Sequence, residues 1–265
     1  MSGRTRKETR RTKRKKKSKQ PGIRPERDSD YMRLFAIGDL HMPGGDDKPM
    51  DVFGSQWDRH FFHISEAWRE TVREEDTVLI PGDISWAMQL ENAIPDLQEI
   101  GALPGRKILC KGNHEYWWSS VSRIRAILPE NMTALQYDAA EAGPCVICGT
   151  RGWNYPTQRN PLSPEDEKVF RRELQRLELA LGRAEALPGE KPILVMIHFP
   201  PRMKEDPETP FTRILEEHPR VKTAVYGHLH GASFAEGFAG EAGGIHYYPV
   251  SCDGIGFRPV EIPWP

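Results

Sequence analysis

Five short apolar segments of the chain each run into a polar motif built from Asp, Asn or His, and this recurrence constrains the fold more than any other feature. The segments are residues 34–37, 78–80, 107–110, 193–197 and 223–226. Short apolar runs of this kind predict buried strands, and α/β proteins carry their sites at the carboxyl ends of such strands. The sequence therefore predicts an α/β fold in which five strand ends build one site.

The five motifs supply eight side chains suited to metal binding or catalysis. They are Asp39, His41, Asp83, Asn113, His114, His198, His228 and His230. Five of the nine histidines fall in these motifs, which scattered core or surface histidines would rarely produce. Mixed imidazole and carboxylate ligation suits Mn, Fe, Zn, Co or Ni rather than Ca.

The order Asp-x-His, Gly-Asp, Gly-Asn-His-Glu, His, Gly-His-x-His resembles the calcineurin-like metallophosphoesterase superfamily over roughly residues 33–261. Within it, the chain looks most like the small bacterial phosphohydrolases. The Ser/Thr protein phosphatases carry Asp-Arg-Gly after the second motif, whereas Ile84 and Ser85 follow Asp83 here, which argues against a protein phosphatase. The resemblance implies a four-layer α/β/β/α sandwich, with two mixed sheets flanked by helices.

The resemblance also implies a role for each motif residue. A first divalent ion would be bound by Asp39, His41, Asp83 and His230. A second would be bound by Asp83, Asn113, His198 and His228, so that Asp83 bridges the pair. The expected reaction is hydrolysis of a phosphomonoester or phosphodiester by a metal-bridging hydroxide. His114 would stabilise the phosphoryl oxygens or protonate the leaving group. Independently of the resemblance, we expect Glu115, or an acid elsewhere in the chain, to orient His114.

Aromatic residues and one arginine lie close to the motifs in the sequence. Flat side chains near a phosphate site suit a nucleobase or another planar group, and Arg151 could contact phosphate. We therefore predict Arg151, Trp86 and Trp117 as substrate-binding residues for a small, nucleotide-like phosphoester. Packing beneath the loops is the alternative for the tryptophans. Trp117 and Trp118 are expected in the first turn of a helix that ends at Leu128, whose N-terminus would favour an anion.

The first 20 residues hold 11 Lys and Arg and one Glu, so the remaining chain carries a net charge of about −11. A block of like charge without apolar periodicity is typical of disorder. We predict a basic tail and linker over residues 1–30 and one metallophosphoesterase domain over residues 31–265. The tail is either a solvated segment or a contact for nucleic acid. The second interpretation keeps open a nuclease or RNA-processing phosphodiesterase, and a non-catalytic metal-bound scaffold is the third alternative.

No apolar run approaches 18 residues, so no membrane span is expected. The basic N-terminus lacks the apolar segment of a secretory signal, and a cytoplasmic location follows as the expectation. Cys145 and Cys148 have the spacing of a metal-binding or redox pair, but they lie in an apolar strand-like run. Alternation along a strand would point their sulfurs to opposite faces, so reduced core thiols are expected.

Hydrophobic periodicity predicts the remaining elements. Helices are expected over residues 57–72, 89–100, 163–186 and 210–217, with Pro95 bending or interrupting the second. Strands are expected over residues 33–37, 77–80, 107–110, 132–135, 144–150, 193–197, 221–226, 245–250 and 257–262. Asp39 and His41 are two residues apart, so an extended backbone would point both side chains the same way.

Overall fold

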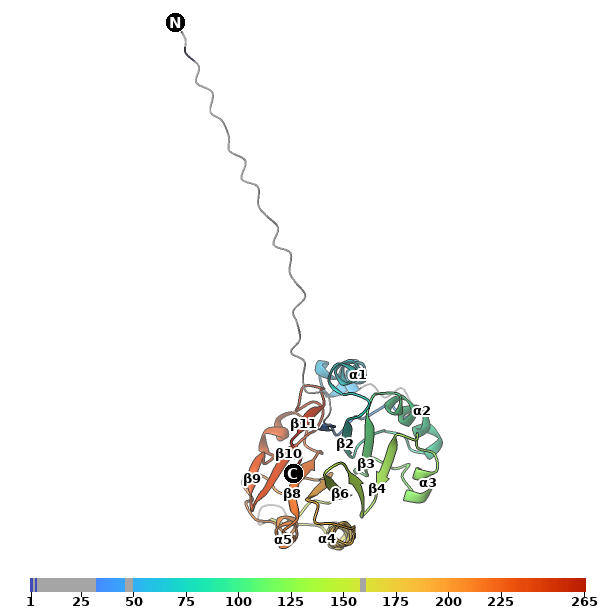
Figure 1. Ribbon diagram of the computed structural model, residues 1–265, viewed down its shortest axis with the longest axis vertical. Coiled ribbons are helices and arrows are strands. Elements are labelled where there is room, and N and C mark those ends of the chain that lie inside the picture. The colour runs from blue at the N-terminus through green and yellow to red at the C-terminus, as the bar shows by residue number, and fades with distance from the viewer. Residues whose placement is uncertain (2, 4–31, 46–49, 158–160) are drawn as a thin grey trace. The chain divides into compact units, whose positions relative to one another are not determined.

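The computed structural model describes residues 1, 3, 32–45, 50–157 and 161–265 (Figure 1). Residues Met32–Pro265 form one compact unit. The predicted basic tail and linker over residues 1–30 lies outside the described residues, apart from Met1 and Gly3.

The first of two mixed sheets contains β1 Leu34–Ala36, β2 Thr77–Pro81, β3 Arg106–Cys110, β4 Met132–Leu135 and β11 Val260–Ile262. Its strand order is β11-β1-β2-β3-β4. Strands β1 to β4 are parallel, and β11 pairs antiparallel with β1 at the edge. The carboxyl ends of β1, β2 and β3 therefore lie side by side.

The second sheet contains β5 Asp138–Ala142, β6 Cys145–Thr150, β7 Ile193–Ile197, β8 Val221–Tyr226, β9 Gly240–Ala242 and β10 Ile245–Pro249. Its strand order is β5-β6-β7-β8-β10-β9. The four central strands are parallel, and the two edge strands β5 and β9 are antiparallel to their neighbours. The carboxyl ends of β6, β7, β8 and β10 accordingly share one edge.

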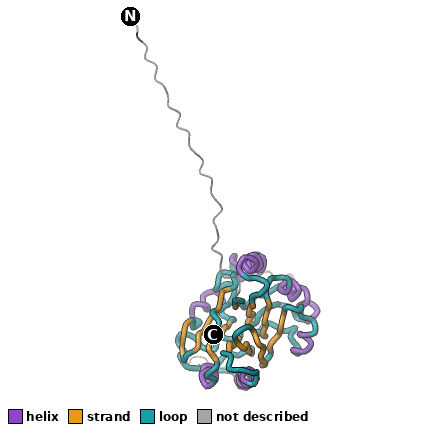
Figure 2. Tube along the Cα trace, viewed as in Figure 1, coloured by secondary structure: helices purple, strands orange, loops and turns teal. Residues whose placement is uncertain are grey.

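Helices cover the outer faces of both sheets, while the strands lie inside (Figure 2). The α-helices are α1 His60–Thr71, α2 Leu90–Gly101, α3 Val121–Arg125, α4 Pro164–Glu185 and α5 Pro210–Glu217. Three 3₁₀ segments are η1 Met50–Phe53, η2 Ser55–Trp57 and η3 Gly231–Glu236. The helices α1, α2 and α3 flank the first sheet, and α4 and α5 flank the second. This arrangement confirms the predicted α/β/β/α sandwich.

Each sheet is buried on both faces, because helices cover one face and the other sheet covers the second. In β2, Val78 belongs to the core beneath the helices, whereas Leu79 belongs to the core between the sheets. In β6, Cys148 and Cys145 divide in the same way between the helix-side and inter-sheet cores. Both cysteines are buried and free. The expectation of core thiols on opposite faces of a strand is therefore confirmed.

Two predicted helices differ from the observed ones. Pro95 lies inside α2 without interrupting it. Helix α3 is short and begins only after the N-cap residue Ser120, so the prediction that Trp117 and Trp118 start this helix is wrong. Trp117 Nε1 donates to the Ser85 carbonyl oxygen at 3.1 Å. This tertiary contact holds the segment as a turn, and no helix N-terminus begins there.

The helix α4 begins as the sequence predicts. Ser163 is its N-cap, Pro164 occupies the first helical position, and the Ser163 hydroxyl accepts a hydrogen bond from the Asp166 amide at 3.1 Å. This cap satisfies one of the amides that a helix start leaves unpaired.

Among the helices in the described ranges, none combines the length and the hydropathy that a membrane span requires.

Candidate metal centre

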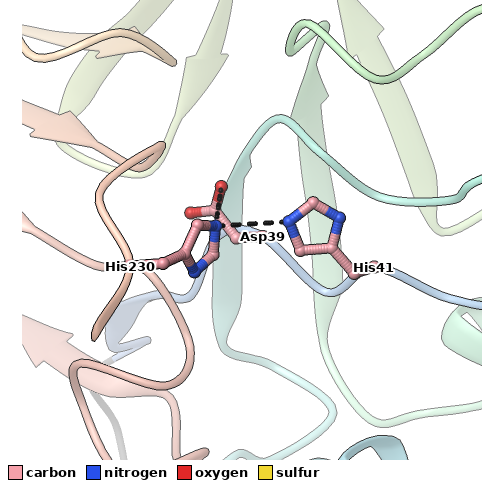
Figure 3. A group of neighbouring side chains, drawn as sticks. All are labelled: Asp39, His41 and His230. Atoms are coloured by element: carbon pink, nitrogen blue, oxygen red, sulfur yellow. Dashed lines mark hydrogen bonds and ion pairs between the residues drawn. The ribbon is translucent and has the colours of Figure 1, made fainter. Parts of the chain in front are cut away.

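The loops after β1, β2, β7 and β8 bring buried carboxylates and imidazoles into one cluster. Two groups of side chains have ligand atoms within 4.8 Å of one another. One group is Asp39, His41 and His230, and the other is Asp39, Asp83 and His198. Figure 3 shows the first group, in which His41 and His230 approach from separate loops and their Nε2 atoms lie 3.2 Å apart.

Asn113 and His228 complete the cluster on the side of His198. The Asn113 Oδ1 atom lies 2.8 Å from His198 Nε2 and 3.0 Å from His228 Nδ1. The tertiary structure thus places all seven predicted metal ligands in one contiguous cluster, although they come from five loops that lie between residues 39 and 230.

The ligand loops have an unusual backbone conformation. Four non-glycine residues have positive φ angles: Asp39 at 58°, His41 at 44°, Asp83 at 52° and His228 at 73°. The expectation of an extended backbone at Asp39 and His41 is therefore wrong, although their side chains do converge. Asp and His enter this region more readily than most residues. Such conformations cost about 1–3 kcal/mol each and cluster at functional sites.

Two glycines allow the backbone to approach the buried carboxylates. A Cβ atom at Gly112 would overlap Asp83 Oδ1, and a Cβ atom at Gly227 would overlap Asp39 Oδ2. The Asp39 carboxylate accepts the His228 amide at 3.0 Å, and Asp83 Oδ1 accepts the His114 amide at 2.9 Å. The glycine of each motif thus lets one loop hold the carboxylate of another.

Hydrogen bonds behind the cluster determine which imidazole nitrogen faces it. His198 Nδ1 lies 2.9 Å from the Pro81 carbonyl oxygen, an acceptor, so Nδ1 carries the proton and donates. His230 Nδ1 likewise lies 2.9 Å from Asp253 Oδ1. In both residues Nε2 therefore faces the cluster, and it would present a lone pair to a metal ion once its proton is displaced, the usual arrangement for a ligating histidine.

Asp253 is a functional residue that sequence reasoning missed. It lies four residues after the end of β10, and its second oxygen accepts the Gly231 amide at 2.9 Å. The signal was present, because Asp253 precedes a glycine shortly after an apolar strand. The strand itself was predicted, but its polar continuation was not connected with the other motifs.

Glu115 has a different position from the one expected. Its buried carboxylate accepts backbone amides of Asp83 at 3.0 Å, Ile84 at 2.5 Å and Gly112 at 2.5 Å. Glu115 therefore joins the ligand loop after β2 to the ligand loop after β3. No described contact supports its predicted role of orienting His114. Burial, followed by the charge of Asp83, raises the pKa of Glu115 to about 7, while its amide donors favour the charged form.

The cluster holds its histidines in two protonation states. Burial lowers the pKa of both His41 and His228 to about 4, so both are neutral at neutral pH. Burial also acts to lower the pKa of His198, but Asp83 outweighs it and raises that pKa to about 9. Burial also acts to lower the pKa of His230, but hydrogen bonds to Asp253 and Asp39 outweigh it and raise that pKa to about 10.

The buried carboxylates show the same balance. Burial raises the pKa of Asp39 and Asp83, yet the neighbouring histidines lower both pKa values overall. The buried carboxylates of Asp39 and Asp83 thus depend on nearby positive charge. Protons on His198 and His230 supply this charge when no metal ion is bound. Divalent ions replace such protons when they bind. The donor set therefore fits transition-metal ions.

A cavity of about 450 Å³ opens beside the cluster. Cluster residues that line it include His41, Asp83, His114, His228 and His230. Its apolar lining comes from Met50, Phe53, Trp57 and Trp86. The Trp86 ring stacks on His41 at 4.9 Å and lies 4.2 Å from the His114 ring. His114 Nε2 lies 3.9 Å from Asp83 Oδ2, so His114 joins the cavity to the cluster.

The other two predicted substrate residues are not among the residues that line this cavity. Trp117 is only 2% exposed and packs in the core, which is the alternative left open for it. Arg151 lines a different cavity and pairs with Glu173. Of the three predicted substrate residues, only Trp86 lies where a ligand at the metal centre would contact it.

The fold and the cluster together define the class of protein: a two-sheet sandwich with a metal centre at its strand ends. The sequence matches the calcineurin-like phosphoesterases over residues 32–232, and the chain belongs to this family. Membership, together with the Asp and His groups of the cluster, supports metal-dependent hydrolysis of phosphoesters as the general activity.

Two solved structures are similar to the chain. A phosphopantetheinyl hydrolase from Mycobacterium tuberculosis is similar at 18% identity, with a TM-score of 0.52, over 87% of this chain and 95% of that chain. A protein of unknown function from Aquifex aeolicus is similar at 17% identity, with a TM-score of 0.49, over 87% of this chain and 96% of that chain. No curated protein matches the chain.

Proposed function

We propose that the chain is a dinuclear metal-dependent phosphoesterase acting on a small phosphoester with a planar or apolar group. The observation that carries the proposal is the position of Asp83 Oδ2. This atom lies 3.9 Å from His41 Nε2 and 3.4 Å from His198 Nε2. One carboxylate oxygen therefore lies between the two groups of ligands, as a bridging ligand must.

Each group would hold one divalent ion. Asp39, His41 and His230 would bind the first, Asn113, His198 and His228 the second, and Asp83 both. Asp39 also belongs to both groups by distance, but its carboxylate is held by the His228 amide. Asp83 uses only Oδ1 for the His114 amide, which leaves Oδ2 for metal. Asp83 is thus the better bridge.

A pair of divalent ions, when bound, lowers the pKa of bound water and neutralises charge on the phosphoryl oxygens. The chain's own contribution is orientation and one hydrogen-bonding side chain. His114 is 30% exposed at its side chain and lines the cavity, but it belongs to neither ligand group. Its imidazole would donate a hydrogen bond to a phosphoryl oxygen, or would donate a proton to the leaving group as a general acid.

The lining of the cavity supports a substrate with a planar or apolar part. Trp86 and Trp57 line the cavity, and Phe53, which also lines it, is 62% exposed. Stacking of a base on an aromatic side chain is worth about 1–3 kcal/mol. Among the described residues, the lining includes no Lys or Arg. A phosphodiester, with a single negative charge, suits such a site better than a monoester or a phosphoprotein.

A substrate screen with manganese tests this proposal. The substrates are bis-p-nitrophenyl phosphate, p-nitrophenyl phosphate, a cyclic nucleotide and a phosphopeptide, and we expect the highest kcat/KM for the diesters. Metal analysis of the same preparation should find about two transition-metal ions per chain. A preference for the phosphopeptide would contradict the substrate class, and one ion or none in metal-replete protein would contradict the dinuclear centre. Hydrolysis that survives complete removal of metal would contradict the proposal as a whole.

A further inference from the structure

A second cavity, of about 250 Å³, lies outside the metal centre and is lined by cationic side chains. We call it the cationic cavity. Lys111 follows β3 directly, Arg151 follows β6 directly, and Arg172 and Arg176 extend from α4. Like the metal centre, the cationic cavity therefore lies at carboxyl ends of parallel strands.

The charges that line the cationic cavity do not balance. Four cationic side chains share one described carboxylate, that of the buried residue Glu173. Glu173 already accepts three hydrogen bonds, from Thr150 Oγ1 at 2.8 Å, from Arg151 at 3.2 Å and from Arg176 at 2.7 Å. A surplus of positive charge in a recess of this kind attracts an anion.

The remaining cations have few partners. Lys111 Nζ donates to a neutral acceptor, the Trp118 carbonyl oxygen at 3.0 Å. The Nε atom of Arg151 is buried and has no hydrogen-bond acceptor among the described residues. Arg172 is exposed and forms no ion pair with another described residue, although it borders the cavity. Donors are thus available to a ligand.

Aromatic rings hold two of the guanidinium groups in place. The Arg151 Cζ atom lies 4.4 Å from the centre of the Trp153 ring, and the Arg176 Cζ atom lies 5.1 Å from that of Tyr137. Such cation–π contacts orient a guanidinium without neutralising it. A planar guanidinium with free donors matches the oxygens of a phosphoryl group.

We propose that the cationic cavity is a second anion site, which binds a phosphoryl group. Its volume falls below that of typical pockets for whole small molecules, which fits a single phosphoryl group. The general activity of the family, hydrolysis of phosphoesters, accounts for the metal centre alone. The cationic cavity would therefore be a site in addition to the metal centre.

The cationic cavity is connected to the metal centre through the backbone. Lys111 precedes the ligand Asn113 by two residues, and the Arg151 carbonyl oxygen accepts the amides of His198 and Phe199, both at 3.0 Å. The phosphoryl group therefore has two possible sources: a second phosphate of the substrate, or a free phosphate that binds beside the centre. Only the first source rests on the proposed function.

Four metal-loaded, full-length proteins test the proposal: wild type, Arg151→Gln, Arg172→Gln and Arg171→Gln. Arg171 is the matched control, because it neighbours Arg172 on α4, changes the same charge, pairs with Glu167 at 2.7 Å and does not border the cavity. Arg172→Gln guards against misfolding, since Arg151→Gln removes a partner of Glu173. Circular dichroism verifies folding of each variant.

The first measurement is equilibrium dialysis with radiolabelled inorganic phosphate. We expect a bound phosphate whose affinity falls about tenfold or more in Arg151→Gln and Arg172→Gln, but stays unchanged in Arg171→Gln. Phosphate at the metal centre would be common to all four proteins and does not obscure this difference. The measurement does not require catalysis, so it distinguishes failure of this proposal from failure of the proposed function.

The second measurement identifies the source of the phosphoryl group. It compares release of p-nitrophenol from the p-nitrophenyl ester of thymidine 5′-phosphate with release from the same ester carrying a 3′-phosphate. A preference for the second substrate that disappears in Arg172→Gln assigns the site to the substrate. Phosphate binding without such a preference assigns it to a free anion. If the four proteins agree in both measurements, the proposal is wrong.

Discussion

The Oδ1 atom of Asp253 lies 2.9 Å from Nδ1 of His230, and this contact turns Nε2 of His230 toward Asp39, 3.5 Å away. Asp253 also accepts the Gly231 amide, so the loop and the ring are fixed together. Carboxylates in this position orient a metal-binding imidazole and raise its basicity. The contact therefore links a residue outside the predicted motifs to the metal affinity of the centre.

Replacing Asp253 with Ala should weaken metal binding by about 10–100-fold, because His230 loses its orienting partner. Titration of metal-free protein against a metal-buffered indicator would measure the change. Glu241→Ala is the matched control, since it removes the exposed partner of His246, 3.7 Å away, outside the metal centre. Equal affinity in Asp253→Ala and Glu241→Ala would contradict the orienting role.

Asp83→Asn should lose most activity and at least one metal ion, because Asp83 Oδ2 approaches both ligand groups. Loss of an ion that supplies several kcal/mol of transition-state stabilisation lowers kcat by at least about 10²-fold. Metal analysis and steady-state kinetics on bis-p-nitrophenyl phosphate would measure both effects. Asp39→Asn is the comparison: a larger metal loss there than in Asp83→Asn would make Asp39 the bridge.

His114→Ala should keep its metal but lose about 10²–10⁴-fold in kcat, since His114 belongs to neither ligand group. The loss should be larger for an ester with a poor leaving group than for a p-nitrophenyl ester, because only the former needs a proton. Kinetics on a matched pair of esters would test this. Equal losses for the pair would instead assign His114 to the phosphoryl oxygens.

Trp86→Ala and Trp117→Ala should have opposite consequences. Trp86 lines the cavity, so its loss should raise KM for a diester with a planar group by about tenfold. Trp117 is buried in the helix-side core, so its loss should lower the free energy of unfolding by about 3–5 kcal/mol. Chemical denaturation and kinetics on both variants would separate the two roles. An unchanged KM in Trp86→Ala would contradict a substrate contact and leave Trp86 with a packing role only.

The stability of the metal-free protein should fall as pH rises from about 6.5 to about 10. The pKa values of His198 and His230, about 9 and about 10, lie above that of an unfolded histidine, about 6.5. The folded state therefore binds more protons than the unfolded state across this window, and the stabilisation is lost as the protons leave. Urea denaturation with a chelator would measure the fall. Stability that stays level or increases over the window would contradict these protonation states.

The sequence by itself determined the strand ends and the side chains they carry. A strand is recognisable from local periodicity, and a polar motif directly after an apolar run needs no tertiary information. Asp83 and His198 could therefore be predicted as neighbours from the family pattern. The same local rule of alternation placed Cys145 and Cys148 on opposite faces of β6.

Only the tertiary structure decided how residues outside these motifs are used. Trp117 and Trp86 look equivalent in the sequence, yet one is buried under the loop and the other lines the cavity. Glu115 accepts the amides of Asp83 and Ile84, which are 32 and 31 residues away in the sequence. Asp253 accepts an amide from a residue 22 positions away. Arg151 lies in the cationic cavity because α4 brings Glu173 beside β6. Burial and pairing over such distances depend on how the layers pack, which local sequence patterns do not encode.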